Sequence, residues 1–545
     1  MAQPRVLIVL ALVAMVSPIW ISIGDHSFNG RSAARYAVVS QEMVNTGDWI
    51  VPHYLGRIHL TKPPLVYWFE SASIEFLGHT FLAVRLPSVM AGTLAVLFLF
   101  WFGRRQVSTR VGLVAAGLYS IMPMTIFPAR MTVTDSIVNL SWMMILYAGF
   151  LRTQHPGQKQ WSALFMLGAS MGMLAKGPVL LIPIGLVWVW LLISDDAERR
   201  PKRMAVYLFQ IILAMLPVLL WAYAVYVNEP NALDIWKHET IDRAVGAGDH
   251  SRPIWFFIPI LLAGCFPASA MLILPGINLR WRQALGSVRS GGLAGFLGWS
   301  IIVPFVIYSL ISGKLASYLL PICSPLALLS AIMLEEWFTN DRPEPAPGRR
   351  LPEVRVGLLI GTVLYITALT LGVWSFYGSE HIVWVLGLVP AVLVAIWLVC
   401  HWRKRAIRAV GIGAFIGAWL VGWLVMEELE DVALSRMSYL AIAHDTFEDG
   451  GWQGQTGVYQ LEDGIIVWDS NGKIEHFLTP DGLRARLETI DEPILILTTA
   501  SKWNHLGELD KAIFNAGTIK ARWEQWPGAD QRYLVVCEPM TTKTD

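Results

Sequence analysis

Long apolar runs dominate this 545-residue chain and limit what it can fold into. A helix needs roughly 20 apolar residues to cross the hydrocarbon core of a bilayer, and about thirteen runs approach that length. Only 15% of the residues are charged, whereas soluble proteins carry about a quarter. The pattern therefore predicts an all-α polytopic membrane protein. The runs lie at 6–23, 83–102, 111–127, 135–151, 161–175, 178–194, 204–227, 254–274, 293–312, 315–334, 354–376, 382–400 and 407–425.

The distribution of basic residues predicts how the chain crosses the membrane. If the N-terminus is cytoplasmic, about twenty lysines and arginines fall in inner segments and about ten in outer ones, as the positive-inside rule requires. The formal net charge is only +1, and nucleic-acid-binding domains carry a basic excess. We therefore expect a protein that contacts membrane lipids, with a cytoplasmic N-terminus and no nucleic-acid partner; in a Gram-negative bacterium it would lie in the inner membrane.

The first outer segment, between the first two apolar runs, is predicted to contain helices that do not span the membrane. The first outer segment, 24–82, contains helix-like stretches at 33–45 and 64–77. The second is too short to span and is rich in aromatic residues, which favours interfacial helices lying along the membrane.

The tail has a different character from the rest of the chain. Strand-length apolar runs occur at 457–461, 465–468, 494–497 and 533–536, with a turn sequence at 469–472. Helical periodicity follows near 480–490 and 504–516. We therefore expect a transmembrane domain at 1–430 and a small extracytoplasmic α+β domain at 435–545, which would be periplasmic in a Gram-negative bacterium.

Cations on the outer side are candidate ligands for a lipid phosphate. Lys62 precedes the aromatic stretch, and Pro63 restricts it to extended conformations. Lys176 and Lys314 occupy tight outer turns, and Asp135 stands just before a span. Each has a structural alternative, because lysines snorkel at interfaces and a carboxylate at a helix start can act as a cap. Their coincidence on one face favours a binding site.

An ordered series of motifs is more specific than any one of its parts. It closely resembles the bacterial aminoarabinose lipid A transferases and their protein O-mannosyltransferase relatives. These C-type glycosyltransferases take a sugar from a polyprenyl-phosphate donor on the outer face of the membrane that they span. The resemblance covers about residues 5–425. The motifs are Arg35-Tyr36-Ala37, Gly47 to Pro52, Lys62 to Trp68, Arg85 to Ser88, Arg130 to Asp135, Ala175 to Pro178 and Lys314 to Pro321.

The resemblance implies a reaction and a set of site residues. An acceptor hydroxyl of lipid A, a glycan or a protein would attack the anomeric carbon in one inverting displacement, and polyprenyl phosphate would leave. Lys62 and Lys176 match the phosphate-contacting lysines, and Asp135 matches an acidic position. Tyr67 and Trp68 would line the substrate groove. Further donor-binding candidates are Arg35, Arg130 and Lys314, with Arg243 or Arg252 as weaker matches.

One departure concerns the general base. The family has an acidic pair shortly before the Arg-Tyr-Ala motif, but this chain reads Ser32-Ala33 there, and neither side chain accepts a proton at neutral pH. Asp25 and Asp135 are the two candidate bases, while the Gly-Asp-Trp setting of Asp48 also suits a turn.

Other functions and a metal site have weaker support in the sequence. His53, His59, His238 and His250 fall in outer segments near Glu239 and Asp242, but their spacing is no recognised ligand pattern. We therefore assign no cofactor and no metal ligands, and leave a divalent ion open. A transporter would show mid-span charges and repeats, which are scarce here. A non-catalytic scaffold that binds polyprenyl phosphate is the alternative that the missing acidic pair supports.

Overall fold

The computed structural model describes most of the membrane domain and part of the tail. Lys62, Lys176 and Asp135 are among the described residues, whereas Asp25 and Arg243 are not. The described residues are 4–24, 28, 31–194, 200–237, 252–269, 272, 292–339, 455–460, 468, 475–477, 479–523 and 531–540.

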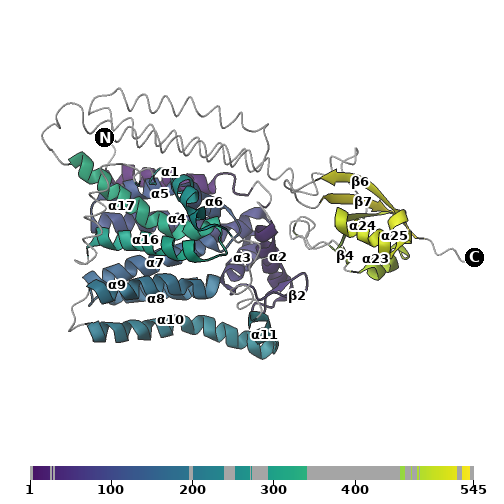
Figure 1. The fold of residues 1–545 in the computed structure, drawn as a ribbon, viewed down its shortest axis with the longest axis horizontal. Helices are drawn as coiled ribbons and strands as arrows, with labels where there is room; N and C mark the ends of the chain where they lie inside the picture. The colour runs from purple at the N-terminus through teal and green to yellow at the C-terminus, as the bar shows by residue number, and fades with distance from the viewer. Residues whose placement is uncertain are drawn as a thin grey trace, which may run out of the picture.

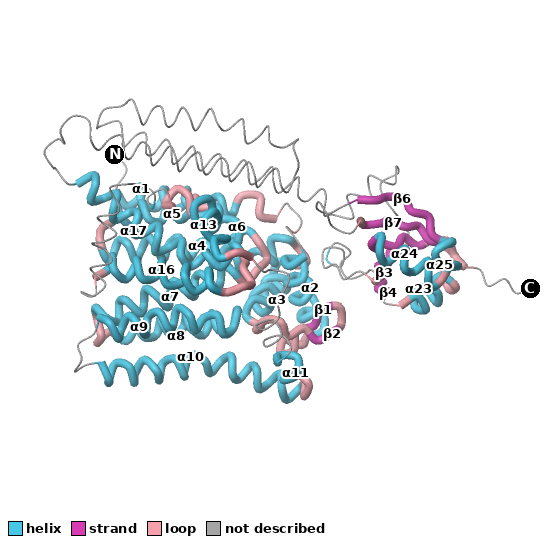
Figure 2. Tube along the Cα trace, viewed as in Figure 1, coloured by secondary structure: helices cyan, strands magenta, loops and turns pink. Residues whose placement is uncertain are grey.

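The membrane part is a bundle of helices that run roughly side by side (Figures 1 and 2). Within the described ranges, five helical stretches are long and apolar enough to cross a membrane, or six if one bent pair counts as a span. One of the five, Lys159–Ile193, includes the turn between α8 and α9 that is described below. The expected runs at 354–376, 382–400 and 407–425 lie outside these ranges. The helices are α1 (Pro4–Trp20), α4 (Phe81–Gln106), α5 (Thr109–Ser120), α6 (Pro123–Arg130), α7 (Asp135–Gln154), α8 (Lys159–Lys176), α9 (Leu181–Ser194), α10 (Arg200–Asn228), α11 (Ala232–Lys237), α13 (Phe257–Gly264), α16 (Leu293–Leu310) and α17 (Leu320–Thr339).

The run expected at 111–127 is not one straight helix. Helices α5 and α6 meet at an angle of 66°. The break falls at Met122, whose ψ of 127° is extended, because a residue that precedes a proline is disfavoured in the helical region. The Thr125 hydroxyl lies 2.5 Å from the Tyr119 carbonyl oxygen and donates to it. Tyr119 is in the last turn of α5, where helix carbonyls lack partners within the helix.

The chain reverses direction between α8 and α9. A Cβ atom on Gly172 would lie 2.5 Å from Cγ of Leu180, although residues eight apart in a continuous helix are separated by about 12 Å. The turn is the short 3-10 helix η1 (Gly177–Leu180), and Gly177 has a φ of 70°, which favours glycine. The fifth and sixth apolar runs therefore form a hairpin, as their interruption at Lys176-Gly177-Pro178 allowed.

Two helices of the first outer segment pack against one end of the bundle. These are α2 (Arg31–Thr46) and α3 (Leu65–Leu77), close to the expected bounds, and Figure 1 places both at the same end as α11. We call this end the α2–α3 end. Between the two helices, β1 (His53–Tyr54) and β2 (Arg57–Ile58) form a short hairpin whose turn amides donate to the Glu42 carboxylate.

The described tail residues form a five-stranded mixed sheet with order β4-β3-β5-β7-β6. Strands β3, β4 and β5 are parallel, whereas β7 is antiparallel to β5 and β6. The tail touches the membrane part through Trp468, whose ring stacks on His79 at 3.7 Å between centroids. The elements are β3 (Thr456–Tyr459), β4 (Glu475–Phe477), α23 (Pro480–Leu487), β5 (Ile494–Thr499), α24 (Ala500–Leu509), α25 (Lys511–Ala516), β6 (Gly517–Trp523) and β7 (Arg532–Cys537).

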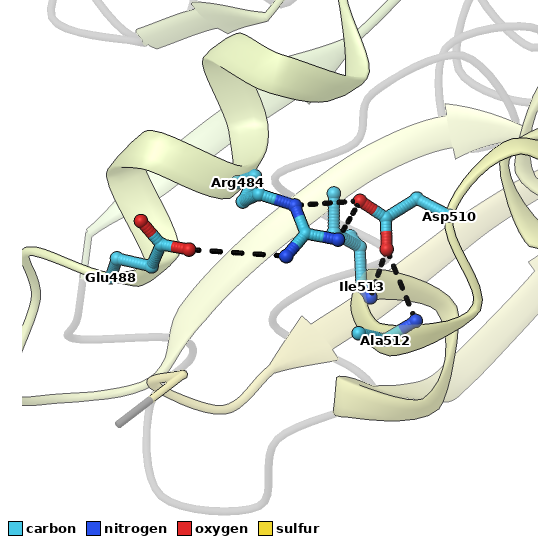
Figure 3. Close-up of polar contacts among 5 residues, drawn as sticks. All are labelled: Arg484, Glu488, Asp510, Ala512 and Ile513. Carbon is cyan, nitrogen blue, oxygen red and sulfur yellow. Dashed lines mark hydrogen bonds and ion pairs between the residues drawn. The ribbon is translucent and has the colours of Figure 1, made fainter. Parts of the chain in front are cut away.

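A single carboxylate joins two helices of the tail (Figure 3). Asp510 caps α25, because its Oδ1 accepts hydrogen bonds from the backbone amides of Ala512 and Ile513. Its Oδ2 accepts two hydrogen bonds from the Arg484 guanidinium on α23. Burial opposes ionisation of Asp510, but the hydrogen bonds from Arg484 and the two amides outweigh it and lower the pKa of this carboxyl group.

Replacing Asp510 with alanine should destabilise the tail by about 1 kcal/mol, the usual value of a helix N-cap. Amide hydrogen exchange in β5 and β7 should then be roughly fivefold faster at neutral pH. Because the pKa of Asp510 is lowered by folding, its contribution is present above the unfolded-state pKa of about 3.9 and disappears as pH falls through the folded-state value. The exposed Asp491→Ala variant is the control, and equal exchange in both variants would contradict this role.

Candidate active site

An ion pair lies at the α2–α3 end of the bundle. The Lys176 ammonium contacts Oδ1 of Asp135 at 2.5 Å, and the two side chains are 19% and 21% exposed. Asp135 begins α7 and Lys176 ends α8. Because these two helices pack antiparallel as neighbours, the start of one meets the end of the other. The Lys176 nitrogen also lies 5.9 Å from the ring centroid of Tyr318, in the 3-10 helix η4 (Ala316–Leu319).

The Lys62 segment lies against the turn that follows Lys176. Cγ of Pro63 lies 3.7 Å from the position that a Cβ atom on Gly177 would occupy. Each of these two residues follows one of the candidate lysines directly, so the contact brings the backbones of Lys62 and Lys176 close together. Lys62 is partly buried. The structure thus pairs Lys176 with Asp135 and places the backbone of Lys62, from a third segment of the chain, close to Lys176.

Two tyrosines form a wall beside this cluster. The rings of Tyr36 and Tyr67 lie 5.6 Å apart between centroids. Burial raises the pKa of Tyr36, the nearby Asp135 charge raises it further, and a hydrogen bond with Thr134 opposes both. Tyr36 therefore connects α2 to the start of α7.

The two aromatic residues expected in a groove differ from each other in exposure and in their contacts. Tyr67 is only 1% exposed, so its side chain packs inside rather than along an open surface. Trp68 is partly buried, and its indole N–H donates to the Trp49 carbonyl oxygen at 2.7 Å.

Two of the other candidate cations bind backbone carbonyls. Arg130 is 3% exposed, and its guanidinium donates to the carbonyl oxygens of Pro18 and Ile21 at the end of α1. Lys314 is 4% exposed, and its ammonium donates to the Arg252 carbonyl oxygen at 3.0 Å. These contacts hold chain segments together. Arg35 and Arg252 are exposed.

The acidic candidates differ in whether the structure describes them and in what their side chains contact. Asp25 lies outside the described residues, as does the candidate cation Arg243. Asp48 accepts hydrogen bonds from the amides of Ile50 and Val51, so its carboxylate closes a local turn. At the position of the missing acidic pair, Ser32 is exposed, whereas Ala33 is buried.

One buried carboxyl group was not singled out from the sequence. Glu70, on α3, is completely buried beside the tyrosine wall and bonds to Ser40 of α2. The available signal was a charged residue one helical turn after Tyr67 in an otherwise apolar stretch. As for a metal, no group of three His, Cys, Asp or Glu side chains in the described ranges could hold an ion. His238, Glu239, Asp242 and His250 fall outside those ranges.

Comparison with known proteins gives the class. Residues 61–221 match the family described as dolichyl-phosphate-mannose-protein mannosyltransferase. The crystal structure of ArnT from Cupriavidus metallidurans bound to undecaprenyl phosphate has the same fold, with a TM-score of 0.74, 19% identity and 98% coverage of both chains. A membrane bundle with these similarities defines a polytopic membrane glycosyltransferase.

Sequence relatives narrow the class to a family. The undecaprenyl phosphate-alpha-4-amino-4-deoxy-L-arabinose arabinosyl transferase of Serratia proteamaculans is 32% identical over 74% of this chain and 73% of its own length. The enzyme of the same name from Edwardsiella ictaluri is 29% identical over 82% and 83%, whereas the match spans 54% of the Aeromonas hydrophila enzyme. The chain belongs to this family of arabinosyl transferases.

Proposed function

We propose that the protein moves a sugar from a polyprenyl-phosphate donor to a hydroxyl acceptor at the α2–α3 end of the bundle. The observation that carries this proposal is the cluster in which Lys176 pairs with Asp135 while Pro63 and Gly177 hold Lys62 alongside. The names of the relatives favour undecaprenyl phosphate as the carrier and 4-amino-4-deoxy-L-arabinose as the sugar. The acceptor is a lipid such as lipid A, a glycan or a protein.

The chemistry follows from the charges of the cluster. The acceptor oxygen forms a bond to the anomeric carbon as the bond from that carbon to the phosphate oxygen breaks, with inversion at the carbon. Negative charge develops on the departing polyprenyl phosphate, and cations fixed in a partly dry site stabilise it strongly. Lys62 and Lys176 supply these cations. The more deeply buried Arg130 and Lys314 order the surrounding chain and add positive charge from further away.

Asp135 is the described carboxylate best placed to take the acceptor proton. It is partly exposed and touches a proposed phosphate-binding lysine, so a proton leaving the acceptor near the phosphate comes within its reach. Asp25 remains the second candidate because its segment lies close in sequence to α2.

The orientation belongs to the same proposal. Basic residues collect in the segments at the opposite end from α2 and α3, which supports an inner-membrane protein with about thirteen spans and a cytoplasmic N-terminus. The α2–α3 end then faces the periplasm. The tail, a separate domain at 435–545 after a membrane domain at 1–430, lies on that side in Figure 1 and contacts His79. A periplasmic tail could guide the acceptor.

Removing either lysine should nearly abolish sugar transfer. We expect Lys62→Ala and Lys176→Ala each to lower the rate by roughly 10²–10³-fold, the loss typical for one preorganised electrostatic group, and to weaken undecaprenyl phosphate binding. The assay uses purified protein with undecaprenyl-phosphate-linked aminoarabinose. Lys159→Ala is the matched control, because this exposed lysine begins α8 at the end opposite Lys176. Full activity in both lysine variants would contradict the assignment of Lys62 and Lys176 as the residues that bind the donor phosphate.

The base is identified by a second pair of variants. Asp135→Asn should slow transfer by about 10²–10⁴-fold, as expected for loss of a general base, while binding of undecaprenyl phosphate persists because Lys176 keeps its charge. Asp25→Asn should keep its activity. Loss in Asp25→Asn alone would assign the base to that residue instead. If the wild-type protein binds undecaprenyl phosphate but transfers no sugar from any donor, the result would favour the alternative function, a non-catalytic scaffold that binds polyprenyl phosphate.

A further inference from the structure

Glu70 is a fully buried carboxyl group that has no part in the proposed chemistry. Its side chain is 0% exposed. Oε2 lies 2.8 Å from the Ser40 hydroxyl oxygen, and Oε1 has no hydrogen-bond partner in the described part of the chain. The ion pairs found among the described residues include none with Glu70. An ionised carboxylate in this place would lack both water and a counter-ion, which is strongly unfavourable.

The hydrogen bonds around Ser40 point to a protonated carboxyl group. The Ser40 hydroxyl oxygen lies 2.9 Å from the Tyr36 carbonyl oxygen and 2.8 Å from Glu70 Oε2. Neither a carbonyl oxygen nor a carboxylate can donate, and one hydroxyl hydrogen satisfies only one of them. If Glu70 carries a proton on Oε2, it donates to Ser40, and Ser40 donates to Tyr36. Both short contacts are then hydrogen bonds.

The neighbouring charges make the protonation state matter for the site. Burial raises the pKa values of both Tyr36 and Tyr67, and a Glu70 charge raises them further, so its electrostatic influence reaches the tyrosine wall. Burial also raises the pKa of Glu70 itself well above its usual value, and the Ser40 hydrogen bond only partly opposes this. The titratable and charged groups of the packed elements include Arg35, Tyr36 and Glu42 of α2, Tyr67 and Glu75 of α3, Arg85 of α4, Asp135 of α7 and Lys176 of α8.

We propose that Glu70 is a positioning residue that acts as a neutral acid, donating its proton to Ser40 and thereby fixing α3 against α2 behind the tyrosine wall. A neutral Glu70 leaves Asp135 as the one described carboxylate charge beside Lys176. Ionisation of Glu70 at alkaline pH would place a second negative charge behind the site, which repels the donor phosphate. This last consequence rests on the proposed function, whereas the protonation of Glu70 does not.

The test compares Glu70→Gln with wild type in thermal unfolding of the full-length protein in detergent, between about pH 6 and pH 9. Glutamine reproduces the neutral acid because its amide donates to Ser40. Since folding raises the pKa of Glu70, the wild type loses stability as pH rises from the unfolded-state value toward the folded-state value. The unfolding midpoint of Glu70→Gln should therefore rise relative to wild type as pH increases. Glu75→Gln, an exposed change on the same helix, should show no such trend.

A pH-independent difference between Glu70→Gln and wild type, or failure of Glu70→Gln to fold, would overturn the neutral-acid assignment. Undecaprenyl phosphate binding on the same proteins tests the link to the site. We expect the wild-type Kd to rise several-fold more than that of Glu70→Gln over this pH range. Equal pH dependence would overturn the link. If neither protein binds undecaprenyl phosphate at any pH while the unfolding trend appears, the proposed function fails and the neutral acid stands.

Discussion

The ion pair between Lys176 and Asp135 depends on how three helices are joined. Helices α7 and α8 run antiparallel, and the chain turns sharply at Gly177 to start α9. The same turn receives Pro63, so the reversal that ends α8 also positions the Lys62 segment. The charged cluster thus arises from the packing of apolar helices, which place their polar ends together at the α2–α3 end. A change at Gly177 would disturb both lysines at once.

The helices were predictable because apolar length is a local signal. Most runs from 83 to 334 and the stretches 33–45 and 64–77 correspond to described helices with small shifts at their ends. The run 254–274 is an exception, because its described part is the short η3 and α13, which together end at Gly264. The bend at Met122 was less accessible, since the run 111–127 is apolar throughout and Pro123 also suits the first turn of a helix. In the tail, β4 and β6 were missed because both carry charged side chains, Glu475 in one and Lys520 and Arg522 in the other.

The site was predictable only in part, because contacts across the bundle decide it. Motif order placed Lys62, Lys176 and Asp135 among the candidates. The fold pairs Lys176 with Asp135 and brings the backbone of Lys62 near Lys176. The same reasoning could not separate them from Arg130 and Lys314, whose side chains bind backbone carbonyls of distant segments. The sequence did not indicate Glu70 as a candidate for a similar reason. Its burial depends on the packing of α3 against α2 and not on its neighbours in sequence.

The number and protonation of the carboxyl groups near the candidate site distinguish this chain from the pattern expected for its family. Ala33, where the resemblance led us to expect an acidic residue, is buried, and Glu70 of α3 is buried in a setting that raises its pKa and favours its neutral form. Among the described residues, Asp135 is the carboxylate that pairs with Lys176.

The most direct test of the proposed phosphate site is an experimental structure of the full-length protein with undecaprenyl phosphate bound. We predict that the phosphate lies between the ammonium groups of Lys62 and Lys176, with Asp135 still beside Lys176 and facing the space where an acceptor hydroxyl would approach. A phosphate bound away from both lysines, with the Lys176–Asp135 pair undisturbed, would contradict this prediction.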